Sequence, residues 1–177
     1  MLDKLKTALV LVVIGAISGL LIFGANEVTQ DGIAANRLAK EQGYYREIFD
    51  LVEGADITTV TTDLTGDLDE EITVSDFSGT VLGYIYKSTE TNNYGDITVL
   101  VGIAVDGTIS KVIISSTTNT PTFVNKIEKN YLDPFDGQAT DDVVYDARTG
   151  ASYTYGSVSK FVEASSSYYE ANRGDAS

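Results

Sequence analysis

The apolar positions of this chain begin with an unbroken run. Residues 7–26, TALVLVVIGAISGLLIFGAN, carry no charge, and Lys4 and Lys6 stand just before them. A helix of about 20 apolar residues is long enough to cross a hydrocarbon layer of roughly 30 Å. Basic residues before such a helix favour the cytoplasmic side for its N-terminal end. The pattern predicts a transmembrane anchor over residues 1–26 with a short cytoplasmic N-terminus. The alternative, a cleaved signal peptide, usually has a shorter apolar part.

Helical spacing follows the anchor. Apolar residues recur at intervals of three and four, which predicts a helix over residues 33–51 inside a connecting helical segment, 27–54. Gly54 is a typical residue for the end of such a helix. The Thr- and Asp-rich stretch 57–71 lacks this periodicity and is interpreted as a loop.

The next part of the chain has the composition of β-strands. Residues 80–89, 96–106 and 108–117 are rich in Val, Ile, Thr and Tyr, and turn signals separate them. Asp106-Gly107, between the last two runs, is a strong hairpin signal. Strands that are connected so closely must be antiparallel.

Two helices and one more strand complete the predicted domain. Apolar spacing predicts helices over residues 123–130 and 155–172, and the stretch 140–147, TDDVVYDA, is interpreted as a strand. This order of elements is typical of an α+β domain in which helices pack on one antiparallel sheet. The predicted domain comprises residues 55–177 and lies on the extracytoplasmic side of the anchor.

Composition excludes several kinds of chemistry. The 177-residue chain has a formal net charge of −14 and contains no Cys and no His. An acidic protein repels phosphate backbones, so nucleic acid is not an expected partner. Disulfides, Cys/His zinc sites and His-dependent nucleophiles are excluded, and redox chemistry needs a bound cofactor. The acidic stretches 63–71 and 133–142 are interpreted as solvated loops rather than calcium sites, so no metal site and no catalytic side chain is predicted.

A small, hydroxyl-rich turn lies between the last predicted strand and the last predicted helix. Unpaired N–H groups and a partial positive charge make a helix N-terminus favourable for an anion, especially a phosphate. Gly150 and Ala151 would let a ligand approach the backbone, and Thr149, Ser152 and Thr154 carry hydroxyl groups. The turn is therefore a candidate phosphate site. The alternative is an ordinary helix start with Thr154 as its N-cap.

The same turn carries a resemblance to a known family. The stretch from Asp146 to Thr154, DARTGASYT, resembles the flavinylation motif of the FMN-binding domain family that RnfG and NqrC subunits share. The motif reads Asp, two variable residues, Ser or Thr, Gly-Ala, Ser or Thr, one variable residue and Thr, and every fixed position is matched. The resemblance implies covalent FMN, joined through its phosphate to the Thr154 hydroxyl by a flavin transferase that uses FAD.

A second stretch extends this resemblance. Residues 93–121 are similar to the middle of the family, in which two strands lead from a Gly-Tyr-Gly loop to a Glu-Thr-Pro-Gly loop. The resemblance implies that Tyr94, Thr120 and Pro121 lie near the isoalloxazine ring of the flavin.

The chain departs from the family in this second loop. Asn119 stands where the family has an acidic residue, residues 121–124 read Pro-Thr-Phe-Val instead of Pro-Gly-Leu-Gly, and an upstream His is missing. These differences bear on the contacts of the ring more than on the attachment of the phosphate. Phe123 could cover a face of the ring, or it could belong to the core.

Taken together, the resemblance implies an electron-transfer flavoprotein subunit of the Rnf complex, a membrane-bound, ion-translocating ferredoxin:NAD oxidoreductase of the prokaryotic cell membrane. Such a chain is an enzyme only as a subunit of this redox-driven pump. The implied partners are a second FMN-bearing membrane subunit, iron–sulfur subunits and the flavin transferase. Two alternatives stay open. One is an NqrC-type subunit of a sodium-translocating NADH:quinone reductase, and the other is a flavin-free, membrane-anchored extracytoplasmic binding module.

Overall fold

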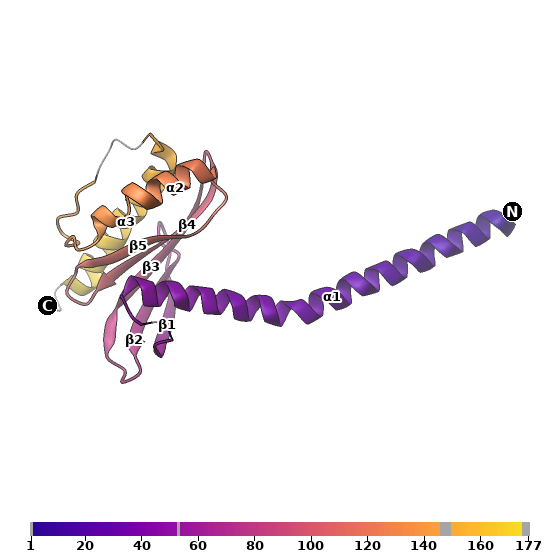
Figure 1. Ribbon diagram of the computed structural model, residues 1–177, viewed down its shortest axis with the longest axis horizontal. Coiled ribbons are helices and arrows are strands. Elements are labelled where there is room, and N and C mark those ends of the chain that lie inside the picture. Colours follow the sequence, from indigo (N-terminus) through magenta and orange to yellow (C-terminus); the bar gives the residue numbers. More distant parts are fainter. Residues whose placement is uncertain (1, 53, 146–149, 175–177) are drawn as a thin grey trace. The chain divides into compact units, whose positions relative to one another are not determined.

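Figure 1 shows the computed structural model of the chain, which describes residues 2–52, 54–145 and 150–174. The chain forms two compact units, Met1–Gln42 and Gly43–Ser177. The elements follow in the order α1 (Leu2–Ile48), β1 (Ile57–Asp63), β2 (Glu70–Asp76), β3 (Val81–Asn92), β4 (Gly95–Ala104), β5 (Ile109–Thr117), α2 (Pro121–Asn130), the short 3-10 helix η1 (Asp133–Phe135) and α3 (Ser152–Arg173).

The first unit consists of α1 residues. The segment Lys6–Asn26 has a mean hydropathy of 2.6 and is long and apolar enough to cross a membrane. Its large apolar side chains are exposed, for example Leu20 at 71% and Phe23 at 67%. A continuous apolar surface of this length is typical of a segment that contacts lipid. The helix predicted over residues 33–51 is confirmed as part of α1, which ends at Ile48 rather than at residue 51.

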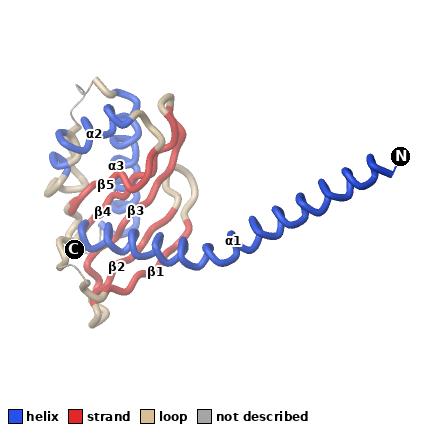
Figure 2. Tube along the Cα trace, turned by 45° about the vertical axis from the view of Figure 1, so that its right-hand side comes forward, coloured by secondary structure: helices blue, strands red, loops and turns tan. Residues whose placement is uncertain are grey.

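The second unit is built on a five-stranded antiparallel sheet with the strand order β1-β2-β3-β4-β5. Each strand turns back beside the one before it, and Figure 2 shows the resulting row of strands. The Asp106-Gly107 hairpin is confirmed: Gly107 has φ +80°, and the Ala104 N–H donates to the Thr108 carbonyl at 2.8 Å. The α+β class is therefore confirmed.

The prediction of a loop over residues 57–71 is wrong. β1 pairs with β2 along its whole length, from Ile57 opposite Asp76 to Asp63 opposite Glu70. β1 is an edge strand whose side chains are almost all exposed, so burial imposes no apolar alternation on its sequence. Its Thr and Val residues favour extended backbone even without that alternation.

The strand predicted over residues 140–147 is wrong for its described part, 140–145, which contains no strand. Val144 is 68% exposed, so it does not anchor the segment in the core. The Val144 N–H donates to the Gln138 side-chain oxygen at 2.6 Å, which takes the place of a bond to a neighbouring strand. A short apolar run without a face to bury did not become a strand.

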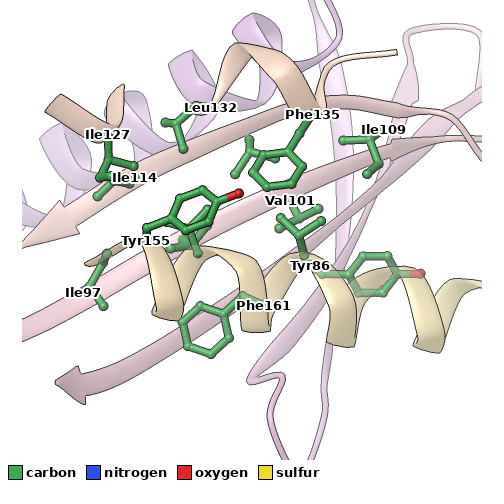
Figure 3. Packing of buried hydrophobic residues seen from close by; sticks show 14 of the residues in the cluster. Tyr86, Ile97, Val101, Ile109, Ile114, Ile127, Leu132, Phe135, Tyr155 and Phe161 are labelled. Carbon is green, nitrogen blue, oxygen red and sulfur yellow. The ribbon is translucent and has the colours of Figure 1, made fainter. Parts of the chain in front are cut away.

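Two helices and one face of the sheet enclose the larger core. Both helices were predicted, and each begins earlier than expected, α2 at Pro121 and α3 at Ser152. Figure 3 shows Val101 of β4 among the rings of Phe135, Tyr155 and Phe161, all of them buried. This core holds the first turn of α3 against the sheet and thereby positions the candidate site.

The end of α1 covers the opposite face of the sheet. Tyr45 and Ile48 pack with Ile72, Ile85 and Leu100, which belong to three successive strands. The last residues of α1 therefore belong to the second unit.

Two strand glycines permit this contact. A Cβ atom at Gly102 of β4 would overlap Cγ2 of Ile48, and one at Gly83 of β3 would overlap the ring of Phe49. Bare backbone at both positions lets these side chains approach the sheet closely.

Gly102→Ala is expected to lower the free energy of unfolding of the second unit by about 2 kcal/mol, because the added methyl group overpacks the contact with Ile48. Urea denaturation followed by circular dichroism measures this change. Gly156→Ala is the matched control, since nothing lies within 4 Å of its Cβ position in α3. Alanine should stabilise that helix by about 1 kcal/mol. A Gly102→Ala variant with the same free energy of unfolding as the wild type would contradict the close approach of Ile48 to Gly102.

Candidate functional site

Three segments of the second unit meet at one end of the sheet: the β3–β4 turn, the loop between β5 and α2, and the first turn of α3. Asp96 and Thr118 join the first two, because the Asp96 N–H donates to Thr118 Oγ1 at 2.7 Å and the Thr118 N–H donates to the Asp96 carbonyl at 2.8 Å. Asn92 joins the turn to α3, since its Nδ2 donates to Ser157 Oγ at 3.0 Å. These polar contacts fix the three segments relative to one another.

Gly95 lets the turn and the loop approach. Its φ of +126° lies in the region that favours glycine, and a Cβ there would stand 2.5 Å from Thr118 Oγ1. The Tyr94 N–H donates to Asn92 Oδ1 at 2.9 Å, which holds the turn in its bent shape. Tyr94 is thus presented toward the start of α3.

Three aromatic rings gather at this junction. The centroid of the Tyr94 ring lies 4.7 Å from that of Phe123 in α2 and 5.2 Å from that of Tyr153 in α3, the latter edge to face. Tyr153 is 50% exposed, while Phe123 is half-buried and also packs on the larger core. A partly exposed aromatic cluster of this kind can cover a planar ligand ring. Sequence reasoning named Tyr94 and Phe123 but missed Tyr153, the variable residue of the motif.

The first turn of α3 differs from the predicted helix start near Tyr155. The helix begins at Ser152, and Ala151 is its N-cap, without a side-chain cap. Thr154 is therefore the third residue of the helix, and the interpretation of Thr154 as an N-cap is wrong. Side chains in a helix lean toward its N-terminus, so a residue at the third position reaches back to the helix start.

Thr154 is fully buried, at 0% exposure, and it contacts the loop before α2. Asn119 Nδ2 donates to Thr154 Oγ1 at 3.2 Å. Asn119 itself is 3% exposed, and its Oδ1 is buried without a hydrogen-bond partner in the described part of the chain. Buried polar atoms nearly always have a partner, so this oxygen is a candidate acceptor for a donor from a ligand or a water. In the sequence, Asn119 stands out only because the family has an acidic residue at this position.

Gly150 and Lys126 form the outer side of the helix start. Gly150 has φ +63°, and a Cβ there would stand 2.9 Å from Lys126 Nζ. Both residues are exposed. The ammonium group of α2 therefore lies over the glycine backbone just before α3. No local pattern in the sequence pointed to Lys126, because the contact crosses from one helix to another.

The remaining predicted site residues have simpler surroundings. Thr120 is the N-cap of α2 and Pro121 is its first residue, and both are exposed. Ser152 is exposed at the first position of α3. Asp146 and Thr149 lie outside the described residues. Among the described residues, no group of three or more His, Cys, Asp or Glu side chains is arranged to hold a metal ion.

A separate apolar hollow lies beside the same helix. Its volume is about 330 Å³, and it is lined by Tyr131, Pro134, Phe135, Gln138, Val144, Tyr145 and Tyr155. Tyr155 follows Thr154 directly, and its ring stacks on that of Phe135 with centroids 6.4 Å apart. Burial raises the pKa of the Tyr145 hydroxyl, which stays neutral at ordinary pH. Sequence reasoning did not find this hollow.

Residues 93–166 match the FMN-binding domain family. The matched stretch contains Tyr94, Asn119, Lys126 and Thr154, so it includes residues from all three segments that meet at the site. The chain is also 26% identical over 147 residues to a subunit of the Na(+)-translocating ferredoxin:NAD(+) oxidoreductase complex of Acetobacterium woodii, and the match covers 77% of this chain and 71% of that protein. Both findings support FMN binding and a role in flavin electron transfer.

The residues at the helix start fit a phosphate-bearing cofactor such as FMN. Gly150 leaves the backbone bare, Lys126 supplies a positive charge, and the buried Asn119 oxygen has no donor among the described residues. The aromatic cluster suits the flavin ring, and the hydroxyl-bearing Thr154 directly follows Tyr153 of that cluster in the first turn of α3.

Gly150→Ala is expected to lower the free energy of unfolding by about 1–2 kcal/mol, because an L side chain is strained at a left-handed φ. The new methyl group would also press on Lys126 Nζ. Adding Lys126→Ala removes that contact and should recover only part of the loss, as measured by urea denaturation. Full recovery in the double variant would show that the backbone angle is not strained.

Proposed function

We propose that this chain is a membrane-anchored electron-transfer flavoprotein subunit that carries FMN as a phosphoester on Thr154. The observation that carries the proposal is the position of Thr154, third in α3 and inside the stretch that matches the FMN-binding domain family. The covalent bond itself is inferred from the flavinylation motif, of which residues 150–154 are described and Asp146 and Thr149 are not.

The helix start suits a phosphate chemically. A residue at the third helical position reaches back toward the N-cap, so a phosphate on the Thr154 oxygen would lie by the first N–H groups of α3. Ala151 at the N-cap has no side-chain oxygen that competes for those groups. The partial positive charge of the helix end favours the phosphate further.

Attachment requires the Thr154 hydroxyl oxygen to form a bond to the flavin-side phosphorus of FAD. The bond from that phosphorus to the oxygen bridging the two phosphates breaks, AMP leaves, and the hydroxyl proton passes to a base of the transferase or to water. Because Thr154 is fully buried, this step requires the first turn of α3 to open locally. Asn119 Nδ2 can donate equally to the hydroxyl before the step and to the ester oxygen after it.

Bound FMN would supply transfer of one or two electrons, and the chain contains no Cys whose thiol could carry out redox chemistry in its place. The chain's own residues hold and shield the flavin. Tyr94, Phe123 and Tyr153 provide the aromatic cluster that would cover its ring. The second unit would lie outside the cytoplasm, where lost FMN is not readily replaced. A covalent bond would prevent that loss.

The similarity to a subunit of an ion-translocating ferredoxin:NAD oxidoreductase supports a place for this chain in a complex of that kind, the Rnf complex. Lys4 and Lys6 before the anchor favour a cytoplasmic N-terminus and an extracytoplasmic second unit. Its partners would then be a second FMN-bearing membrane subunit and iron–sulfur subunits. An NqrC-type subunit of a sodium-translocating quinone reductase stays the second candidate, since the FMN-binding domain occurs there as well.

Thr154→Val is expected to abolish covalent flavin in the full-length chain produced together with an active flavin transferase. The wild type should gain the mass of one FMN less one water and fluoresce as a flavin after denaturing electrophoresis. Thr154→Ser should keep the label because it keeps the nucleophilic oxygen.

Ser152→Ala is the matched control, since it removes an exposed hydroxyl from the same helical turn. It should be labelled as fully as the wild type. Covalent flavin on the Thr154→Val variant would show that FMN is attached to another residue. An unlabelled wild type would favour the flavin-free binding module.

A further inference from the structure

We propose that Lys126 is the residue that binds the phosphate of the attached flavin, closing a cradle whose other side is the start of α3. This inference rests on the proposed function and extends it to a residue that the flavinylation motif does not contain. The cradle consists of Gly150, the first turn of α3 and the Lys126 ammonium group.

The placement of Lys126 is set by packing. Val124 and Ile127 are buried on one side of α2, and this fixes which residues of α2 face outward. Lys126 then lies with its Nζ 2.9 Å from the place where a Cβ of residue 150 would be. Gly150 leaves that space free, so a phosphate could contact backbone and ammonium together.

The electrostatics of this arrangement point to an anion. A cation stabilises a helix at its C-terminus and is repelled by the partial positive charge at the N-terminus. Lys126 nevertheless stands beside the N-terminus of α3. A phosphate between the two positive groups turns a repulsion into two attractions.

In the other lysines of the second unit, the positive charge is compensated within the protein. Lys87, Lys111 and Lys160 each form an ion pair with a carboxylate. Lys129 lies in the last turn of α2, where the helix end itself favours a cation. Within the described part of this acidic chain, Lys126 has neither kind of compensation. A phosphate at the start of α3 would provide such compensation.

The second, independent observation is the buried oxygen of Asn119. Asn119 is 3% exposed and contacts Thr154 through Nδ2, while Oδ1 lacks a donor among the described residues. A ribityl hydroxyl of FMN, or a water ordered by it, would supply that donor. The inner side of the cradle thus also fits a ligand with phosphate and hydroxyl groups.

The test uses the full-length chain in detergent with purified flavin transferase and FAD. Lys126→Gln is compared with Lys129→Gln, which removes the same charge from the last turn of α2, and with Lys126→Arg, which keeps the charge. Two quantities are measured for each variant. The first is the initial rate of FMN attachment against NaCl concentration, and the second is the rise in unfolding temperature that attached FMN produces.

Lys126→Gln should attach FMN about ten-fold more slowly at low salt, with a weaker salt dependence, because a charge-assisted phosphate contact is lost. The rise in unfolding temperature should shrink in the fully labelled variant. Without flavin, this variant should melt at the same temperature as the wild type or slightly above it, because Lys126 is exposed and its repulsion by the start of α3 is removed. Lys129→Gln and Lys126→Arg should resemble the wild type in every measurement.

Equal flavin-dependent stabilisation of Lys126→Gln and the wild type would overturn the role of Lys126 and leave the proposed function intact. If Lys129→Gln lowered the attachment rate and the flavin-dependent stabilisation as much as Lys126→Gln does, the effect would come from the overall charge of the chain. That result would also overturn the role of Lys126. A wild type without flavin would overturn the proposed function itself, and the inference with it.

Discussion

One buried contact, between the Asn119 amide and the Thr154 hydroxyl, joins the two parts of the chain on which this site depends. The residues are 35 positions apart in the sequence, and both are buried. The contact ties the loop before α2 to the first turn of α3. It therefore sets where a phosphate on Thr154 would lie relative to Lys126 and to the aromatic cluster.

The same contact creates a tension between stability and modification. A buried hydroxyl is not accessible to another enzyme, so attachment of a flavin needs local opening. The buried Val158, Phe161 and Val162 lie one turn later and would keep the rest of α3 in place, but Tyr155 would have to leave the core. Exposed Gly156 weakens the helix near its start. Opening of the first turn would withdraw Tyr155 from the core of Figure 3, while Phe161 and the strand residues could stay in place.

The two faces of the sheet pack against different helices. One face carries α2 and α3 and so builds the candidate site at its end. The other face receives the last residues of α1, which approach because Gly83 and Gly102 lack side chains. A single helix thus contains the apolar segment Lys6–Asn26 and, at its other end, residues that belong to the core of the second unit.

Signals that are local in the chain were sufficient for much of the fold. The apolar run near the N-terminus, the Asp106-Gly107 hairpin and the later helices depend on residues close in sequence, and the structure contains all of them. β1 escaped prediction because an edge strand with exposed faces has no alternation to detect. Val143 and Val144 mislead in the opposite way, since adjacent apolar residues predict a strand that the described residues 140–145 do not form.

The sequence by itself determined the apolar N-terminal helix, the α+β class and the motif that singles out Thr154, because each depends on the order of neighbouring residues. Only the tertiary structure decided that Thr154 is buried and third in its helix, that Asn119 contacts it, and that Lys126 lies over Gly150. These contacts bring together residues from separate helices and loops. Packing of α2 and α3 on one sheet creates them, and no short stretch of sequence records that packing.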